Sequence, residues 1–297
     1  MTRTALEFVP PDIEGGLNSV VEDTNKIRDL SREFGIENSI DTLLIPGMIT
    51  EDADRPVEMK PKMDPLDVWK AAVSELPGMH GLCTQVTAFL DQAQLERRFQ
   101  ELLDSGIEGI IFVGVPRTMA DGEGEGVSPV DALDIFRDQV PDRGAILIPT
   151  REAEEGRFNY KCERGATFAL TQLLYSGSIL EFLSGFAEKH SHRPEILLSF
   201  GYVAKLESSL RMIRWLIQDP GNPVVDEEQA FIGRLADMNA KEKIALMFDL
   251  YKRVIDGVRT MGFPISLHFE APYGFSKPAF EMFAKMLDYW SPENGNK

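Results

Sequence analysis

Short apolar runs alternate with longer amphipathic stretches along this chain, and this alternation predicts strands followed by helices. The apolar runs are rich in Val, Ile, Leu and Phe, which suits buried strands, and they are too short for helices. Residues 16–34 carry apolar side chains near one helical stripe, which predicts a helix. Asp91 is expected to cap another helix that ends at Ser105, with Gly106 as its stop. The eight predicted strands are residues 5–9, 41–47, 82–89, 109–115, 145–149, 166–172, 195–200 and 264–269.

Eight strands that alternate with helices in a chain of 297 residues predict an α/β protein with a (β/α)8 TIM-type barrel. A doubly wound open sheet is the main alternative, but no Gly-x-Gly-x-x-Gly follows the first strand, which weakens it. Residues 1–297 are therefore predicted to form one catalytic domain with long βα loops and a tail from about 291. Residues 50–67 and 220–240 are predicted to be irregular, with a helix around 241–261 after the second of them.

Composition narrows the classes of protein that fit. Hydrophobic residues make up 43% of the chain, which is ample for a core, and no apolar run is long enough to span a bilayer. The net charge of −17, from 31 basic and 48 acidic residues, argues against a nucleic-acid binder or a binder of anionic membranes. Cys83 and Cys162 do not form a disulfide framework and no apolar signal region is visible, so we expect a cytoplasmic protein. The sequence indicates no oligomeric state.

Glu7 is the most informative residue, because it is a carboxylate inside a short apolar run, Ala5–Val9, that Pro10 and Pro11 close. A carboxylate among Leu, Phe and Val is costly to bury, and the usual outcome is a raised pKa or a hydrogen-bonded partner. A protonated carboxyl at the end of a strand is what general acid catalysis needs. From the local pattern alone, a glutamate that points from an edge strand into water is an equally good interpretation.

Polar residues at the carboxyl ends of the strands are the candidates for chemistry, because barrel enzymes place their sites there. The Gln172 amide offers a donor and an acceptor together, which suits the edge of a heterocycle, although a core glutamine bound to backbone fits equally well. The polar residues at these ends are Glu7, Thr84, Gln85, Thr87, Arg117, Thr150, Gln172, Tyr202, His268 and Glu270.

The other motifs favour no simple chemistry. Residues 121–126 are glycine-rich, but their two glutamates would repel phosphate, so Lys60, Lys62 and Arg117 are better anion candidates, with solvated surface charge as the alternative. The four histidines show no metal-ligand spacing, and no metal site is predicted. No Gly-x-Ser-x-Gly turn appears, and no lysine at a strand end is placed for a Schiff base, which disfavours a hydrolase and an aldolase.

Two segments carry a family resemblance. Leu6–Pro11 resembles the Phe-Glu-Phe-Phe-Pro-Pro opening of methylenetetrahydrofolate reductases, and Gly165–Tyr175 resembles their Gly-Ala-Asp-Phe-x-x-Thr-Gln-x-Phe-Tyr/Phe segment. Weaker similarity runs through Leu82–Val115, Glu195–Val203 and His268–Phe269, so nearly the whole chain is covered. The resemblance implies a (β/α)8 barrel of one-carbon metabolism and methionine biosynthesis that reduces 5,10-methylenetetrahydrofolate to 5-methyltetrahydrofolate.

The same resemblance implies roles for particular residues. Glu7 matches the family's general acid, and Gln172 matches the glutamine that binds the pterin. Four further residues near these positions or at the ends of the last strands are candidates for binding the folate: Tyr175, Tyr202, His268 and Glu270.

The departures from the family pattern concern the flavin. Val113–Arg117 replaces the usual Leu-Arg-Gly-Asp-Pro, Pro149–Arg157 replaces a Tyr-Pro-Glu-x-His-Pro stretch, and Cys83–Thr87 replaces a His-Leu-Thr region. The folate-stacking aromatic falls near Met212. The resemblance therefore implies a divergent branch without FAD, in which NADH or NADPH passes hydride directly to the folate.

Two alternatives stay open: retention of FAD through unfamiliar contacts, and a barrel that binds folate without reducing it. If the hydride donor binds at the rim, the candidates to hold it are Lys60, Lys62, Thr84, Gln85, Thr87, Gly114, Arg117 and Thr150.

Overall fold

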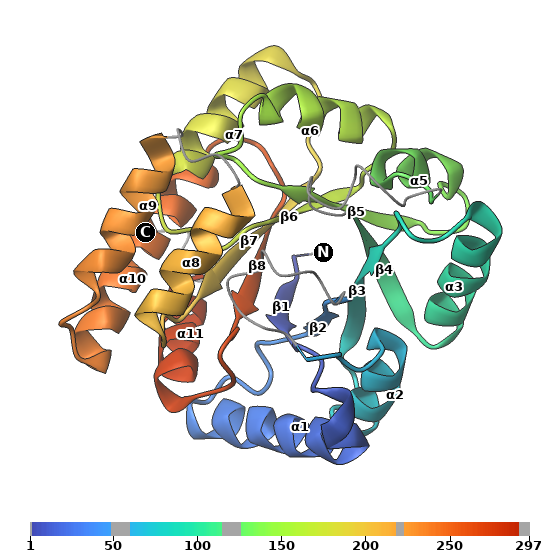
Figure 1. Cartoon of the computed structure of the whole chain (residues 1–297). Helices are drawn as coiled ribbons and strands as arrows, with labels where there is room; N and C mark the ends of the chain where they lie inside the picture. The colour runs from blue at the N-terminus through green and yellow to red at the C-terminus, as the bar shows by residue number, and fades with distance from the viewer. Residues whose placement is uncertain (1, 49–59, 115–125, 218–222, 291–297) are drawn as a thin grey trace.

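Eight parallel strands form a closed barrel in which each strand pairs with the next and the last pairs with the first (Figure 1). The computed structural model describes residues 2–48, 60–114, 126–217 and 223–290, with the side chains of 212–217 and 223–225 excepted. The closed barrel confirms the predicted fold class. The strands are β1 (Thr4–Glu7), β2 (Thr42–Ile45), β3 (His80–Val86), β4 (Ile107–Val113), β5 (Asp142–Leu147), β6 (Phe168–Thr171), β7 (Glu195–Gly201) and β8 (Ile265–Glu270).

Helices surround the barrel as an outer layer (Figure 1). None of the helices that the structure describes is long and apolar enough to cross a membrane. The described helices are η1 (Ile13–Gly15), α1 (Gly16–Glu33), α2 (Pro65–Glu75), α3 (Gln92–Asp104), α5 (Pro129–Ile135), α6 (Glu154–Glu163), α7 (Ser178–Lys189), α8 (Leu206–Ile217), α9 (Pro223–Arg234), α10 (Ala240–Val258) and α11 (Lys277–Trp290).

Local sequence signals explain where α3 begins and ends. The Asp91 side chain accepts from the Gln94 backbone, and Gln94 returns a bond to the Asp91 N–H, which forms the capping box that starts α3. Gly106 follows that helix with a φ of 93°, a conformation that glycine adopts readily. The predicted helix therefore has its expected start and stop.

Two predictions of irregular segments were wrong in part. Residues 50–67 were expected to be irregular, but α2 begins at Pro65, and residues 50–59 lie outside the described residues. Residues 220–240 were expected to be irregular, but α9 occupies Pro223–Arg234, so β7 is followed by α8 and α9 before α10. Proline at the first helical position and Asp226 in the first turn are both favourable helix-start features. The density of proline and glycine just before the segment obscured these signals.

The strands separate two hydrophobic clusters, and this separation shows which side chains enter the barrel. One small cluster from β2, β3, β4, β6 and β7 fills the interior, whereas a much larger cluster joins the outer faces of the strands to the helices. Leu6 and Phe8 belong to the outer cluster. Because neighbouring side chains of a strand point to opposite faces, Glu7 between them points into the barrel. The interior cluster consists of Leu44, Leu82, Ile111, Phe168, Leu170 and Leu197.

An ion-pair network closes the amino-terminal end of the barrel. Arg3 lies 2.7 Å from Asp142 at the start of β5 and 2.7 Å from Glu195 at the start of β7. Its guanidinium carbon also lies 4.8 Å from the centre of the Phe168 ring in the interior cluster. With this end filled, the polar side chains at the opposite, carboxyl ends of the strands are the ones that a ligand can reach.

We predict that Gly144→Ala in β5 destabilises the protein by about 1–3 kcal/mol, because a barrel core has no room for an added methyl group. A Cβ at Gly144 would lie 2.5 Å from the Phe168 ring and 2.6 Å from Ile111. Urea unfolding measures the change.

The matched control is Gly185→Ala in α7, where a Cβ meets nothing within 4 Å. This variant should be stabilised by up to about 1 kcal/mol, because alanine is the better helix former. Equal effects of the two substitutions would contradict the packing described for the barrel interior.

Candidate active site

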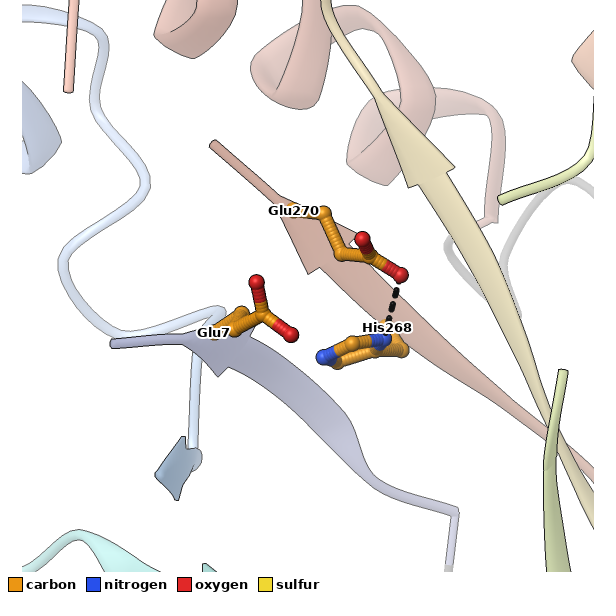
Figure 2. Close-up of side chains that lie close together, drawn as sticks. All are labelled: Glu7, His268 and Glu270. Carbon is orange, nitrogen blue, oxygen red and sulfur yellow. Dashed lines mark ion pairs between the residues drawn. The ribbon is translucent and has the colours of Figure 1, made fainter. Parts of the chain in front are cut away.

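The carboxyl ends of β1 and β8 bring three ionisable side chains together inside the barrel mouth (Figure 2). Ala5 lies beside His268 in the β1–β8 pairing, so the next inward pair along the two strands is Glu7 and Glu270. One nitrogen or oxygen atom from each of Glu7, His268 and Glu270 lies within 4.8 Å of the others. These three residues are called here the mouth cluster.

Ser199 determines which nitrogen of the His268 ring carries the proton. The Ser199 hydroxyl donates to the Thr171 carbonyl at 2.8 Å and lies 2.8 Å from His268 Nδ1. Nδ1 also faces the Glu270 carboxylate at 3.5 Å, so both of its neighbours accept a hydrogen, and Nδ1 carries the proton. Nε2 then carries an unprotonated lone pair, and this buried atom has no hydrogen-bond partner within the described part of the chain. Burial lowers the pKa of His268 to about 4, so the ring is neutral at physiological pH.

The two carboxyl groups of the cluster hold protons unusually tightly. Burial, together with repulsion from Glu270, raises the pKa of Glu7 to about 8, although His268 opposes the shift. Burial also raises the pKa of Glu270 to about 7, although the nearby Ser199 hydroxyl opposes the shift. Because like charges so close disfavour double ionisation, the two groups titrate as a pair. At neutral pH the site therefore contains at least one protonated carboxyl that can act as an acid.

Gln172 faces the same space from the end of β6, which β7 separates from β8. Phe168 and Leu170 of β6 belong to the interior cluster, and Gln172 continues their alternation just beyond the end of the strand. Its backbone N–H donates to the Leu147 carbonyl at 3.2 Å. Its side-chain amide forms no hydrogen bond with any residue that the structure describes, which leaves a donor and an acceptor for a ligand.

The two predicted tyrosines are both buried, in different surroundings. Tyr175 is 5% exposed, and burial, followed by the charges of Glu270 and Tyr273, raises its pKa well above the usual value. The Tyr175 hydroxyl thus lies close enough to the mouth cluster to feel its charge. Tyr202 is 9% exposed, and its pKa is raised by burial and then by Glu281 of α11, which places it on the helix side of the rim.

The polar residues at the end of β3 face in different directions. Thr84 is buried and its hydroxyl accepts from the Gly47 N–H at 2.7 Å. The Gln85 amide is engaged with Arg98 at 3.1 Å and with its neighbour's backbone carbonyl, on the side of α3. The Thr87 hydroxyl is fully buried and has no hydrogen-bond partner among the residues that the structure describes. Of these three side chains, Thr87 has the free polar group that most needs a ligand.

The other described residues predicted to hold the hydride donor lie apart from one another around the mouth of the barrel. Lys60 lies 3.0 Å from Glu14 in an exposed ion pair, and Lys62 lies 2.7 Å from Asp12. Gly114 follows β4, where a Cβ would approach the Pro129 ring at 3.3 Å, and Thr150 is a buried residue after β5. Arg117 lies outside the described residues.

Sequence reasoning missed Ser199, which holds the His268 ring. Its position inside an apolar strand, two residues before the glycine that ends β7, was the available signal. A serine in an otherwise apolar inward row requires a polar partner, but the sequence does not reveal which partner it has.

Comparisons with known proteins were made at the level of families, curated proteins and solved structures. A family model described as mycobacterial methylenetetrahydrofolate reductase matches residues 1–294. No curated protein matches the chain. A solved structure described as "Structural study of Project ID from Aquifex aeolicus VF5" is 14% identical, covers 79% of this chain and 91% of its own, and has a TM-score of 0.41.

We predict that Glu7→Gln stabilises the protein at alkaline pH. The folded state raises the pKa of this carboxyl from 4.5 to about 8, so wild-type stability falls as pH rises between these values. A neutral amide escapes this loss, and the variant should exceed wild type by about 2 kcal/mol or more at pH above 8, since each pKa unit corresponds to about 1.4 kcal/mol. The measurement is urea unfolding from pH 5 to 9.

The control for this prediction is Glu281→Gln, which removes an exposed carboxylate 3.2 Å from Lys285. That change should shift the free energy of unfolding by less than about 1 kcal/mol at every pH. A stability difference between Glu7→Gln and wild type that does not change with pH would contradict the raised pKa.

Proposed function

The chain belongs to the methylenetetrahydrofolate reductase family, and from this premise we propose that it reduces 5,10-methylenetetrahydrofolate to 5-methyltetrahydrofolate with hydride taken directly from NADH or NADPH. Family membership indicates an oxidoreductase that acts on folate. The observation that carries the proposed reduction of the folate is the buried Glu7 carboxyl, whose pKa of about 8 keeps it protonated at neutral pH in the open end of the barrel.

The first step is a proton transfer from Glu7. The carboxyl donates its proton to N10 of the folate, directly or through one water, and the bond between N10 and the bridging carbon breaks. The five-membered ring opens and leaves an iminium cation at N5. The Glu7 carboxylate that remains then stabilises the neighbouring positive charge.

The second step reduces the iminium carbon. That carbon accepts hydride from C4 of the nicotinamide and becomes the methyl group, so one proton and one hydride have been added and the oxidised nicotinamide is the other product. Gln172 holds the pterin edge through its free amide, which fixes the angle at which the reacting carbons meet. Glu270, His268 and the two buried tyrosines, Tyr175 and Tyr202, complete the proposed folate surface.

The chain's own residues fit poorly with a flavin after β5. Residues 148–153 lead directly into α6, and Arg151 donates to Glu154 at 2.7 Å. Glu154 is itself buried and accepts from Lys161 at 3.1 Å and from the Ile148 N–H at 3.4 Å. Arg151 and Lys161 are thus neutralised by Glu154 within the protein, which supports the proposal that no flavin pyrophosphate binds to them.

The hydride donor is proposed to lie along the rim from β3 to β5, where the flavin of other family members would lie. Thr87 is the strongest anchor among the described residues there, because its hydroxyl is buried and unpaired. The full set of proposed contacts remains Lys60, Lys62, Thr84, Gln85, Thr87, Gly114, Arg117 and Thr150.

We expect the purified protein to show no flavin absorbance and to oxidise NADH or NADPH only when 5,10-methylenetetrahydrofolate is present. The absorbance spectrum and the loss of nicotinamide absorbance are read in the same cuvette. A bound flavin would show that the usual two-step route is retained. Tight folate binding without oxidation of either nicotinamide, with or without added FAD, would instead indicate a binding protein.

Glu7→Gln should lose about 10²–10⁴-fold in kcat, the usual size of a general acid contribution. In the wild type, kcat/KM should fall as pH rises through about 8, because the carboxylate that forms in the free enzyme cannot protonate N10. Glu281→Gln, on the exposed face of α11, is the matched control and should keep full activity. Near-wild-type turnover of Glu7→Gln would remove Glu7 from the mechanism.

A further inference from the structure

The mouth cluster also has the composition of a metal site. Glu7, His268 and Glu270 each contribute one potential ligand atom, and these atoms lie within 4.8 Å of one another. We propose that the cluster binds a divalent transition-metal ion of the Zn²⁺ class, held by the His268 ring and one oxygen from each glutamate. The sequence predicted no metal site, because the cluster joins strands from opposite ends of the chain.

The orphaned nitrogen of His268 points to a ligand independently of the two carboxyl groups. The ring is fully buried, and Nε2 is one of two buried side-chain atoms without a hydrogen-bond partner among the described residues. In Figure 2 the nitrogen opposite the Glu270 contact is turned toward Glu7. A buried lone pair without a donor is a costly feature that a bound cation would satisfy.

The surroundings of the ring match those of a metal ligand. Histidines that bind metals usually donate their second N–H to an oxygen, which fixes the ring and leaves the other nitrogen free to coordinate. Ser199 provides that oxygen at 2.8 Å from Nδ1 and is itself held by the Thr171 carbonyl at 2.8 Å. This support comes from the protein's own residues, and it orients the imidazole for coordination.

Charge and access also suit a divalent cation. When both glutamates are ionised and the imidazole is neutral, the cluster carries a charge of −2. A divalent ion cancels this charge, so the carboxylates no longer need protons to relieve their repulsion. One nitrogen and two oxygen ligands favour Zn²⁺ or Co²⁺ over Mg²⁺ and Ca²⁺, which prefer oxygen alone. Three protein ligands leave a position for water. The Glu270 side chain is 14% exposed, so an ion can enter from the barrel mouth.

Binding at this place has one consequence that rests on the proposed function. A cation coordinated by Glu7 occupies the carboxylate oxygen that would carry the catalytic proton, so the metal-bound protein cannot protonate N10. We therefore expect Zn²⁺ to inhibit folate reduction and chelator to restore it.

The test is a Co²⁺ titration of chelator-treated protein, followed by the visible d–d absorption that coordinated Co²⁺ shows. The expected result is one Co²⁺ per chain, displaced by Zn²⁺. His268→Ala should lower the affinity at least 100-fold, and Ser199→Ala should lower it about 10–100-fold, the usual effect of losing a supporting contact. Thermal unfolding checks that each variant is folded, and Glu270→Gln replaces His268→Ala if the latter does not fold.

His80→Ala is the matched control, because His80 pairs with Glu108 at 2.7 Å on the exposed surface and has no third ligand among the described residues. Its affinity for Co²⁺ should equal that of wild type. No Co²⁺ spectrum at millimolar metal, or a spectrum that His80→Ala abolishes and His268→Ala keeps, would overturn the proposal. If Co²⁺ binds as expected but metal-free protein never oxidises NADH or NADPH, the cation site stands and the proposed function fails.

Discussion

The pairing of β8 with β1 is the constraint on which the rest of the structure depends. It closes the barrel, and its register places Ala5 beside His268 and continues to Glu7 beside Glu270. Because adjacent residues in a parallel pair point to the same face, closure forces two carboxyl groups and an imidazole into one buried space. A slip of β8 by one residue would turn His268 and Glu270 toward the helices and away from Glu7.

Burying these groups lowers stability, and the surrounding structure compensates for it. The interior cluster below them is apolar, and Arg3 joins β1 to β5 and β7 at the far end through Asp142 and Glu195. The ion pairs and the apolar cluster thus stabilise the barrel away from the site. This stability offsets the cost of burying the ionisable groups of the mouth cluster. This division between a stable amino-terminal end and a strained carboxyl-terminal end is general for barrel enzymes.

Protons and metal ions relieve the same electrostatic problem in different ways. Two adjacent carboxylates in a medium of low polarity need positive charge, and a proton on Glu7 supplies it in a form that can be passed to a substrate. A divalent cation would supply it more strongly but would block the transfer. Proposed catalysis and proposed metal binding therefore exclude one another, and the neutral His268 ring, supported by Ser199, favours both states.

The sequence by itself determined the eight strands, the Asp91 helix cap and the unusual position of Glu7, since periodicity, capping residues and an isolated charge are local signals. It failed at Pro223–Arg234, where proline and glycine just before the helix hid its start. Only the tertiary structure decided that Glu7 meets His268 and Glu270 and that Ser199 sets the tautomer of the ring. These contacts join residues far apart in the chain, and they follow from barrel closure and strand register, which no local pattern encodes.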